Sequence, residues 1–219
     1  MTQSITIGIL SIQGDIEENA SAVQQSMHEL NIQGNVILIK ELSKIDTLDG
    51  LVIPGGESTV IGTLLFLEES QKEILKKKIL DGLPVLGTCA GLIFLSKRAY
   101  DKRLGNTKQH LLGLLDVTVE RNAFGRQHES FENQLSIPAI GDKLFKGVFI
   151  RGPIITETGN DVEVLSRLEE KIVAVQQKNI LATSFHPELA NDNRFHRKLI
   201  ELCLSYNKSK DSDTLITNP

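Results

Sequence analysis

The sequence predicts an α/β protein with a mostly parallel β-sheet and helices on both faces of the sheet. Short apolar runs rich in β-branched residues alternate with stretches of helical periodicity through the first half of the 219 residues. The apolar runs are nearly continuous, which is typical of strands that are buried on both faces of a parallel sheet. Glycine-containing turns follow two of these runs, where a strand is expected to end and a helix to begin.

The first half of the chain provides the clearest elements. A strand is expected over residues 4–12, and it ends at Gln13 and Gly14. Asp15 then has the position of a helix N-cap, with Glu18 at the spacing of a capping box. The apolar face of this helix consists of Ile16, Ala20, Val23, Met27 and Leu30. The same reasoning predicts strands over 36–39, 50–53 and 84–86, and helices over 58–68, 71–80 and 90–98.

Short strand-like runs dominate the second half, and we expect them to include antiparallel pairs. They cover residues 116–121, 131–137, 145–150, 162–168, 172–176 and 180–184. A closing helix carries an apolar stripe from Phe195 to Tyr206, with Asn191 or Asp192 as its cap. The sequence therefore predicts one domain over residues 1–206 and a polar, flexible tail over residues 207–219.

The composition excludes or disfavours several classes of protein. Hydrophobic residues make up 40% and charged residues 24% of the chain, which excludes disorder as its main state. A net charge of −4 and an aromatic content of 5% disfavour nucleic-acid binding. No apolar run approaches the about 18 to 20 residues that a membrane span needs, and the N-terminus lacks the pattern of a signal peptide. Two cysteines form neither a disulfide framework nor a metal cluster, so we expect a cytoplasmic protein with reduced thiols and no metal.

The segment from Gly87 to Gly91 predicts a nucleophilic cysteine. Cys89 lies between an apolar strand and an apolar helix, with a glycine two residues away on each side. This is the spacing of a nucleophile elbow, in which a sharp turn exposes the nucleophile and small residues let the chain pass. The beginning of the following helix favours a thiolate, and the N–H of Ala90 is placed to face a developing oxyanion. Cys203 lies on the apolar stripe of the last helix and is interpreted as a core residue.

A cysteine nucleophile needs a general base and a group that orients the base. His186 and Glu188 follow the strand predicted over 180–184, so they are expected at the carboxyl edge of the sheet, together with Cys89. Residues two apart in an extended segment point the same way, and Pro187 stiffens the segment. We therefore interpret His186 as the base and Glu188 as its orienting carboxylate. The remaining histidines are interpreted as structural or solvent-exposed: His28, His110, His128 and His196.

Two further segments are candidates for ligand binding. Gly55 and Gly56 follow a strand and precede a helix, where glycines let the backbone present N–H donors to a ligand. Gln13 follows the first strand and is expected on the same rim. Arg121 and Arg151 each follow a strand and offer guanidinium groups that can clamp a carboxylate.

Taken together, these motifs resemble the class I, triad-type glutamine amidotransferases, with GTCAG as the cysteine elbow and HPE as the histidine–glutamate pair. Within that class, the sequence is most similar to the glutaminase subunits of pyridoxal 5′-phosphate synthases. The similarity runs nearly from end to end, through GILSIQGD, IPGGEST, GTCAGLIFL, LLGLLDVTVERNAFGRQHESFE, GVFIRGP and ATSFHPEL. The combination of ERNAFGRQ, SFE and FIRGP is the most specific part.

The resemblance implies a fold and a set of site residues. The fold is a flavodoxin-like three-layer α/β/α sandwich with a mixed, mostly parallel sheet. The implied catalytic residues are Cys89 as nucleophile, His186 as general base and acid, and Glu188 as the third member of the triad. The implied glutamine-binding residues are Gly56, Glu57, Ser58, Arg121, Ile150 and Arg151. The implied oxyanion hole consists of Gly55, Gly56 and Ala90, with Gln13 nearby.

The resemblance also implies an activity and a partner. The chain would hydrolyse L-glutamine to L-glutamate and ammonia through a γ-glutamyl thioester. The ammonia would pass to the synthase (lyase) subunit in a large hetero-oligomer, without nucleic acid or membrane. Pyridoxal 5′-phosphate is then the product of the complex, and no cofactor is expected on this chain. The stretch from Asp15 to Asn19 departs from the basic residue and histidine that the family often has there, and we expect this departure to affect partner contacts rather than chemistry.

Three other functions fit the same residues. The chain could be the glutaminase subunit of a different amidotransferase, although the ERNAFGRQ segment argues against this. A thiol hydrolase that acts alone on a γ-glutamyl substrate would need no partner. A scaffolding subunit with an inactive site would keep its function without Cys89.

Overall fold

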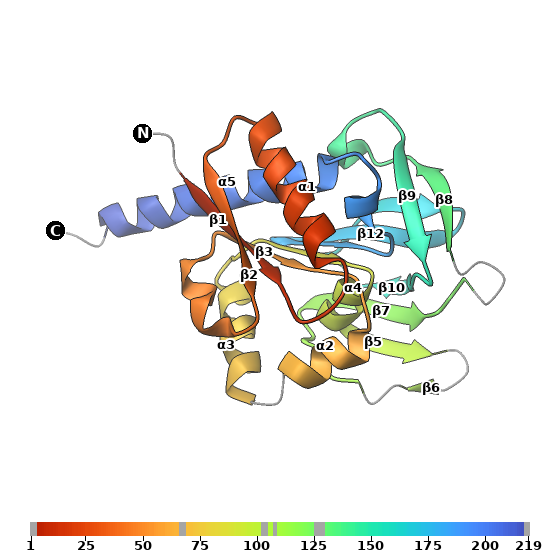
Figure 1. The fold of residues 1–219 in the computed structure, drawn as a ribbon. Coiled ribbons are helices and arrows are strands. Elements are labelled where there is room, and N and C mark those ends of the chain that lie inside the picture. Colours follow the sequence, from red (N-terminus) through yellow and green to blue (C-terminus); the bar gives the residue numbers. More distant parts are fainter. Residues whose placement is uncertain (1–3, 66–68, 102–104, 107–108, 125–129, 217–219) are drawn as a thin grey trace.

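The computed structural model describes residues 4–65, 69–101, 105–106, 109–124 and 130–216 (Figure 1). Its α-helices are α1 (Ile16–Glu29), α2 (Ser58–Leu65), α3 (Glu69–Leu80), α4 (Ala90–Leu95) and α5 (Arg194–Ile216). Its strands are β1 (Ile5–Leu10), β2 (Gly34–Ile39), β3 (Gly50–Ile53), β4 (Val85–Thr88), β5 (Ser96–Asp101), β6 (Gly105–Asn106), β7 (Leu115–Arg121), β8 (Ser130–Leu135), β9 (Phe145–Ile150), β10 (Ile154–Thr158), β11 (Glu163–Leu168), β12 (Lys171–Gln177) and β13 (Ile180–Thr183). Short 3₁₀ helices cover Leu42–Thr47, Pro138–Ile140 and Pro187–Leu189.

One mixed sheet organises the described residues. Its order is β2-β1-β3-β4-β13-β12-β10-β7-β5-β6, and β11 pairs with β12. The five strands from β2 to β13 in this order are parallel, whereas β12 is antiparallel to β13 and β10 is antiparallel to β12. The strands β8 and β9 form a separate antiparallel hairpin. The predicted parallel first half and the predicted antiparallel pairs in the second half are both confirmed.

Helices cover both faces of the sheet, as Figure 1 shows. On one face, α1 and α5 pack with the β8–β9 hairpin in one hydrophobic cluster, which includes Val23, Phe149 and Leu199. On the other face, α2, α3 and α4 pack in a second cluster, which includes Ile61 and Leu75. The central strands supply both clusters because successive side chains of a strand point to opposite faces. This is the three-layer sandwich that the resemblance implied.

One predicted helix is shorter than expected. The sequence predicts a helix over 90–98, but α4 ends at Leu95, and Ser96 begins the strand β5. The Ser96 hydroxyl donates a hydrogen bond of 2.7 Å to the carbonyl of Ile93 at the end of the helix. From there β5 pairs in parallel with β7, and Arg98 donates a hydrogen bond of 2.9 Å to Thr118. Sheet pairing with a distant strand therefore overrides the local helical pattern.

The strands β5, β6 and β10 are absent from the sequence prediction. β6 has only two residues, and β10 reads IITET with an irregular register against β7. Neither β6 nor β10 has the continuous apolar run from which the other strands were predicted. In contrast, the boundaries of β7, β9, β11, β12 and β13 agree with the predicted runs to within about two residues.

The closing helix begins and ends differently from the prediction. Of the two predicted caps, Asp192 is the one that acts, because its Oδ1 accepts a hydrogen bond of 3.2 Å from the backbone N–H of Arg194. The helix α5 continues to Ile216 without a break at position 207, where the sequence placed the start of the tail. Residues 66–68, at the end of the helix predicted over 58–68, lie outside the described residues.

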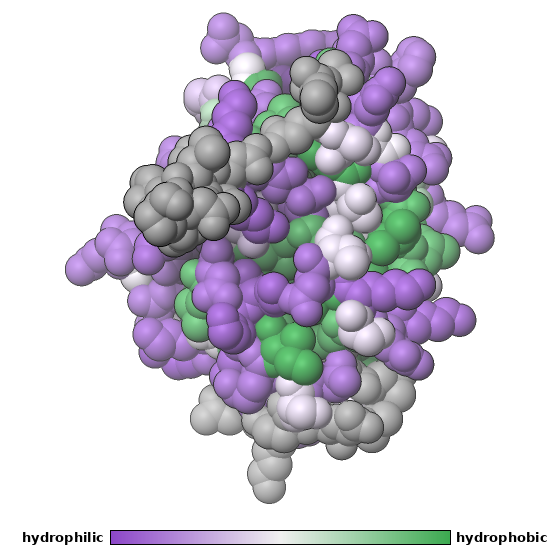
Figure 2. Space-filling view, turned by 90° about the vertical axis from the view of Figure 1, so that its left-hand side faces the viewer, coloured by the Kyte–Doolittle hydropathy of each residue, from purple (hydrophilic) through white to green (hydrophobic). Residues whose placement is uncertain are grey.

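The surface seen in Figure 2 is mostly hydrophilic, with small hydrophobic patches between polar side chains. The exposed large hydrophobic residues of the described chain are Leu38 in β2, Val60 in α2, Ile74 and Leu80 in α3, and Leu144 before β9. None of the helices in the described part of the chain is long and apolar enough to cross a membrane.

A buried histidine links α5 to α1. His196 is fully buried, and its Nε2 is 3.3 Å from Oδ1 of Asn19. Its Nδ1 has no hydrogen-bond partner. Burial lowers the pKa of His196 from 6.5 to about 4, because the protonated form would be desolvated. The folded chain therefore holds this imidazole in its neutral form.

We expect His196 to make the stability depend on pH. The free energy of unfolding should fall as the pH drops from 6.5 to about 4, because only the unfolded chain binds the proton in this range. The loss from this residue is on the order of 3 kcal/mol, at about 1.4 kcal/mol per pKa unit. Urea unfolding at several pH values measures this decrease in the free energy of unfolding. The His196→Gln variant should lack this part of the pH dependence, and an equal dependence in the variant would contradict the assignment.

Candidate active site

Cys89 occupies a strained turn between β4 and α4. Its backbone has φ 48° and ψ −98°, a conformation that residues with a side chain rarely adopt. Two glycines permit the turn. A Cβ on Gly91 would overlap the carbonyl oxygen of Ile53, and a Cβ on Gly87 would lie 2.6 Å from Leu95. The predicted elbow geometry is therefore confirmed. The Cys89 side chain is largely buried, and its Sγ lies 4.0 Å from the carbonyl oxygen of Ile150.

His186 follows β13, which is the parallel neighbour of β4 in the sheet. The pair Thr88 and Thr183 is in register, and the backbone N–H of Cys89 donates a hydrogen bond of 2.8 Å to the carbonyl of Thr183. The backbone N–H of His186 donates to the carbonyl of Val148 at 2.8 Å, which anchors the segment to β9. Sheet pairing thus places the cysteine turn and the histidine segment side by side.

Glu188 orients the imidazole of His186, as the sequence predicts. Its Oε1 is 2.9 Å from Nδ1 of His186, and its side chain has no exposed surface. The segment is only partly extended, because Pro187–Leu189 forms a 3₁₀ helix. The second carboxylate oxygen of Glu188, Oε2, is buried without a hydrogen-bond partner.

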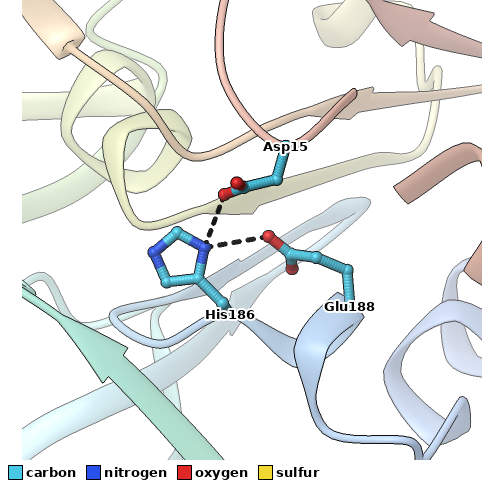
Figure 3. Close-up of side chains that lie close together, drawn as sticks. All are labelled: Asp15, His186 and Glu188. Carbon is cyan, nitrogen blue, oxygen red and sulfur yellow. Dashed lines mark hydrogen bonds and ion pairs between the residues drawn. The ribbon is translucent and has the colours of Figure 1, made fainter. Parts of the chain in front are cut away.

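A second carboxylate contacts the same ring nitrogen. Oδ2 of Asp15 also lies 2.9 Å from Nδ1 of His186, and Figure 3 shows the two carboxylates converging on this atom. Asp15 occupies the N-cap position of α1, as predicted, but its side chain makes no capping hydrogen bond. Its carboxylate turns toward His186 instead. The expectation that the departure between Asp15 and Asn19 affects partner contacts stays a prediction.

Asp15 is a site residue that the sequence motifs did not predict. One signal was available: Asp15 stands two residues after Gln13, at the carboxyl end of a parallel strand, where ligand-binding groups gather. The capping-box spacing by itself explains an aspartate at that position, so a role of Asp15 in the site was not considered.

The electrostatic environment strongly favours a protonated imidazole. Burial by itself would lower the pKa of His186, but hydrogen bonds with Asp15, Cys89 and Glu188 outweigh it and raise the pKa well above 6.5. The hydrogen bond to His186 lowers the pKa of Asp15, whereas burial raises the pKa of Glu188. The half-exposed Asp15 is thus the carboxylate that holds its negative charge more readily.

The same three side chains are the set with metal-ligand chemistry among the described residues. The ligand atoms of Asp15, His186 and Glu188 lie within 4.8 Å of one another. Both carboxylates contact the same ring atom, Nδ1 of His186, as expected for acceptors that share one N–H. We therefore assign the three side chains as a hydrogen-bonded group. The expectation that the chain needs no cofactor stays a prediction.

The glycine turn after β3 lies against this group. The backbone has φ 139° at Gly56 and φ 100° at Gly14, and a Cβ on Gly14 would overlap the carbonyl oxygen of Gly55. A Cβ on Gly55 would collide with the imidazole of His186. Both turns therefore need glycine. Oε1 of Gln13 accepts a hydrogen bond of 3.2 Å from the backbone N–H of Glu57, which ties the two turns together.

The predicted glutamine-binding residues come from several elements. Nη2 of Arg121, at the end of β7, is 3.4 Å from Oε1 of Glu57. Ser58 is buried at the start of α2. Arg151 is exposed and has a positive φ of 45° next to Ile150. The structure therefore places Arg121 against Glu57 and Ile150 against Cys89, while residues 125–127 of the ERNAFGRQ motif lie outside the described residues.

Comparison with known proteins agrees with this geometry. A model of the SNO glutamine amidotransferase family matches residues 9–205. The chain is 49% identical over 199 residues to the pyridoxal 5′-phosphate synthase subunit PdxT of Nitrosopumilus maritimus, covering 91% of this chain and 97% of that protein. It is 48% identical over 196 residues to the protein of the same name from Thermotoga neapolitana, covering 90% and 98%.

Solved structures give the same result. A crystal structure of a glutamine amidotransferase matches with a TM-score of 0.78 and 41% identity, over 90% of this chain and 98% of that one. A glutamine amidotransferase from Thermotoga maritima, at 13% identity and a TM-score of 0.58, shares the fold over 96% of this chain and 86% of its own. On the family match and on the identity to its relatives, this chain belongs to the SNO glutamine amidotransferase family.

Proposed function

We propose that this chain is the glutaminase subunit of a pyridoxal 5′-phosphate synthase and hydrolyses L-glutamine to L-glutamate and ammonia. The proposal rests on one observation above all: a strained cysteine turn lies beside a histidine–carboxylate group in a member of the glutamine amidotransferase family. A cysteine, a base and an orienting carboxylate are the components of thiol-based amide hydrolysis.

In the proposed reaction, Sγ of Cys89 attacks the side-chain amide carbon of glutamine. The imidazolium of His186 donates a proton to the nitrogen as the carbon–nitrogen bond breaks, and ammonia leaves. The γ-glutamyl group then remains on Cys89 as a thioester. His186, now neutral, takes a proton from water as the water attacks the thioester, and glutamate leaves with return of the thiolate. Glu188 keeps the ring oriented through Nδ1, which leaves Nε2 for these proton transfers.

The negative oxygen that develops in each step needs hydrogen-bond donors. We assign this role to the backbone N–H groups of Gly55, Gly56 and Ala90. The glycine turn lies against His186, so its donors are within the same site. Gln13 lies near this turn and stabilises it, because its side chain accepts a hydrogen bond from the backbone N–H of Glu57.

The charged pair of Glu57 and Arg121 suits the two charged groups of the substrate. Glutamine carries an α-ammonium and an α-carboxylate group, and the pair offers one charge of each sign at 3.4 Å separation. We propose that Arg121 binds the carboxylate and Glu57 the ammonium group, so that the substrate replaces the contact between them. Gly56, Ser58, Ile150 and Arg151 complete the proposed pocket, and the carbonyl of Ile150 already lies next to Cys89.

The partner in this proposal is the synthase (lyase) subunit, in a large hetero-oligomer in the cytoplasm. The relatives named pyridoxal 5′-phosphate synthase subunit PdxT match this chain over about nine-tenths of its length. Free ammonia is protonated in neutral water and loses its nucleophilicity, so a direct transfer to the partner protects it. Pyridoxal 5′-phosphate is then a product of the complex, and the chain itself needs no cofactor, metal, nucleic acid or membrane.

We expect glutamate release from L-glutamine to depend on Cys89 and to increase strongly when the synthase subunit is added. Cys89→Ala should reduce turnover by at least about a thousandfold, because the nucleophile is lost. Cys203→Ala provides a matched control, since Cys203 is a buried residue of α5. Full turnover without the synthase would favour an independent hydrolase instead. A Cys89→Ala variant that keeps its turnover would contradict the proposal.

We also expect Arg121→Ala to raise the KM for glutamine by about 10- to 100-fold, because a charge-assisted hydrogen bond contributes about 1.5 to 3 kcal/mol. The effect on kcat should be smaller. Arg98→Ala is the control, since Arg98 makes an ion pair with Glu157 at the same distance of 3.4 Å outside the proposed pocket. Steady-state kinetics of the complex measure both. Equal KM values for the two variants would contradict the assignment of Arg121 to the glutamine pocket.

A further inference from the structure

The turn between β1 and α1 reaches the imidazole that the proposed reaction uses. Oδ2 of Asp15 and Oε1 of Glu188 are each 2.9 Å from Nδ1 of His186 (Figure 3). A ring nitrogen carries at most one hydrogen, so the two carboxylates compete for or share a single N–H. A single carboxylate is sufficient to orient the imidazole of His186. The presence of a second carboxylate on the same N–H therefore needs an explanation.

The two carboxylates differ in what surrounds them. The Glu188 side chain is fully buried, and its Oε2 has no partner, so its ionised form is poorly solvated. The Asp15 side chain is 32% exposed and stands at the beginning of α1, where water and the helix dipole both stabilise a negative charge. Asp15 is therefore the better anion for a protonated imidazole, while Glu188 provides a rigid acceptor.

Asp15 also connects His186 to the glycine turn. Gln13, two residues earlier, accepts a hydrogen bond from the backbone N–H of Glu57. Gly14 packs directly on the carbonyl of Gly55. The carboxylate of Asp15 itself lies beside Gly55, 3.1 Å from the place that a Cβ on this glycine would take. One short segment thus contacts both the proposed oxyanion turn and the proposed base.

We propose that Asp15 is a positioning residue of the glutaminase reaction, which holds the imidazole of His186 together with Glu188 and fixes it relative to the glycine turn. The proposal rests on the proposed function and adds a residue to it. In this proposal Asp15 acts through His186, whose Nδ1 it contacts, and not on the substrate.

The charges around the ring agree with this role. The groups that face His186 are Asp15 from the β1–α1 turn, Glu188 from the 3₁₀ helix and Cys89 from the β4–α4 turn. Of the two carboxylates, Asp15 contributes more to the raised pKa of His186, and its own pKa is lowered by the same contact. Removal of its charge should therefore make the imidazolium less stable.

The test compares Asp15→Asn with Asp15→Glu and with Glu18→Gln. Asp15→Asn keeps the shape and removes the charge, whereas Asp15→Glu keeps the charge. Glu18→Gln is the control, because Glu18 is exposed in the first turn of α1 and this substitution also removes one negative charge. Two quantities are measured for each variant: the titration midpoint of His186 by NMR of the free chain, assigned with a His186→Ala variant, and kcat and KM for glutamine in the complex with the synthase subunit.

Asp15→Asn should lower the titration midpoint of His186 by about one to three pH units, as expected when an opposite charge in contact is removed. It should lower kcat by about tenfold, since Glu188 remains as an orienting group, and leave KM within about twofold. Asp15→Glu should recover most of both effects, and Glu18→Gln should resemble the unchanged chain.

An unchanged titration midpoint or an unchanged kcat in Asp15→Asn would overturn the role of Asp15, as would an equal effect of Glu18→Gln. A failure of the proposed function is distinguishable from these results. If the unchanged chain hydrolyses no glutamine with or without the synthase subunit, the proposed function fails. The titration of His186 then still decides whether Asp15 holds the imidazole.

Discussion

The parallel pairing of β1, β3, β4 and β13 is the constraint on which the site depends. Neighbouring strands in a sheet are about 4.8 Å apart, and parallel strands end at the same edge. The register of the pairing fixes how far each strand extends relative to its neighbour, since Ile53 pairs with Gly87 and Thr88 pairs with Thr183. The turns that follow these strands carry the glycine pair, the nucleophile and the imidazole. Backbone hydrogen bonds therefore set the distances between groups that lie up to about 170 residues apart in the chain.

Close packing at this edge leaves little room for side chains. The turns at Gly14, Gly55 and Gly91 touch neighbouring backbone or ring atoms at places where a Cβ would collide. Cys89 keeps its side chain in this crowded region at the cost of a backbone conformation that is strained by about 1 to 3 kcal/mol. The well-packed clusters on both faces of the sheet hold that turn in place. Strain at the nucleophile is thus maintained by a core that extends through all three layers.

Much of this arrangement could be predicted from the sequence, and the failures have physical causes. Buried parallel strands leave continuous apolar runs, so β1, β3, β4 and the edge where they end were predictable, and with them the association of Cys89 with His186 and Glu188. The strands β5 and β10 were not predictable, because their sequences SKRAYD and IITET carry no continuous apolar run. They form through pairing with β7, which is a contact between distant segments. Local patterns cannot encode such a contact, and a helix that continued past Leu95 was the better local interpretation.

Asp15 illustrates a different limit, because its local and distant roles favour the same residue. A carboxylate at the beginning of α1 is stabilised by the free N–H groups and the dipole of the helix, whether or not its side chain makes a capping bond. In a parallel α/β fold, the helix that follows a strand begins at the edge where the functional groups gather. An anion that is suited to a helix start is then also near any imidazolium at that edge. Pattern alone cannot separate the two roles, and the direction of the side chain, here toward Nδ1 of His186, decides between them.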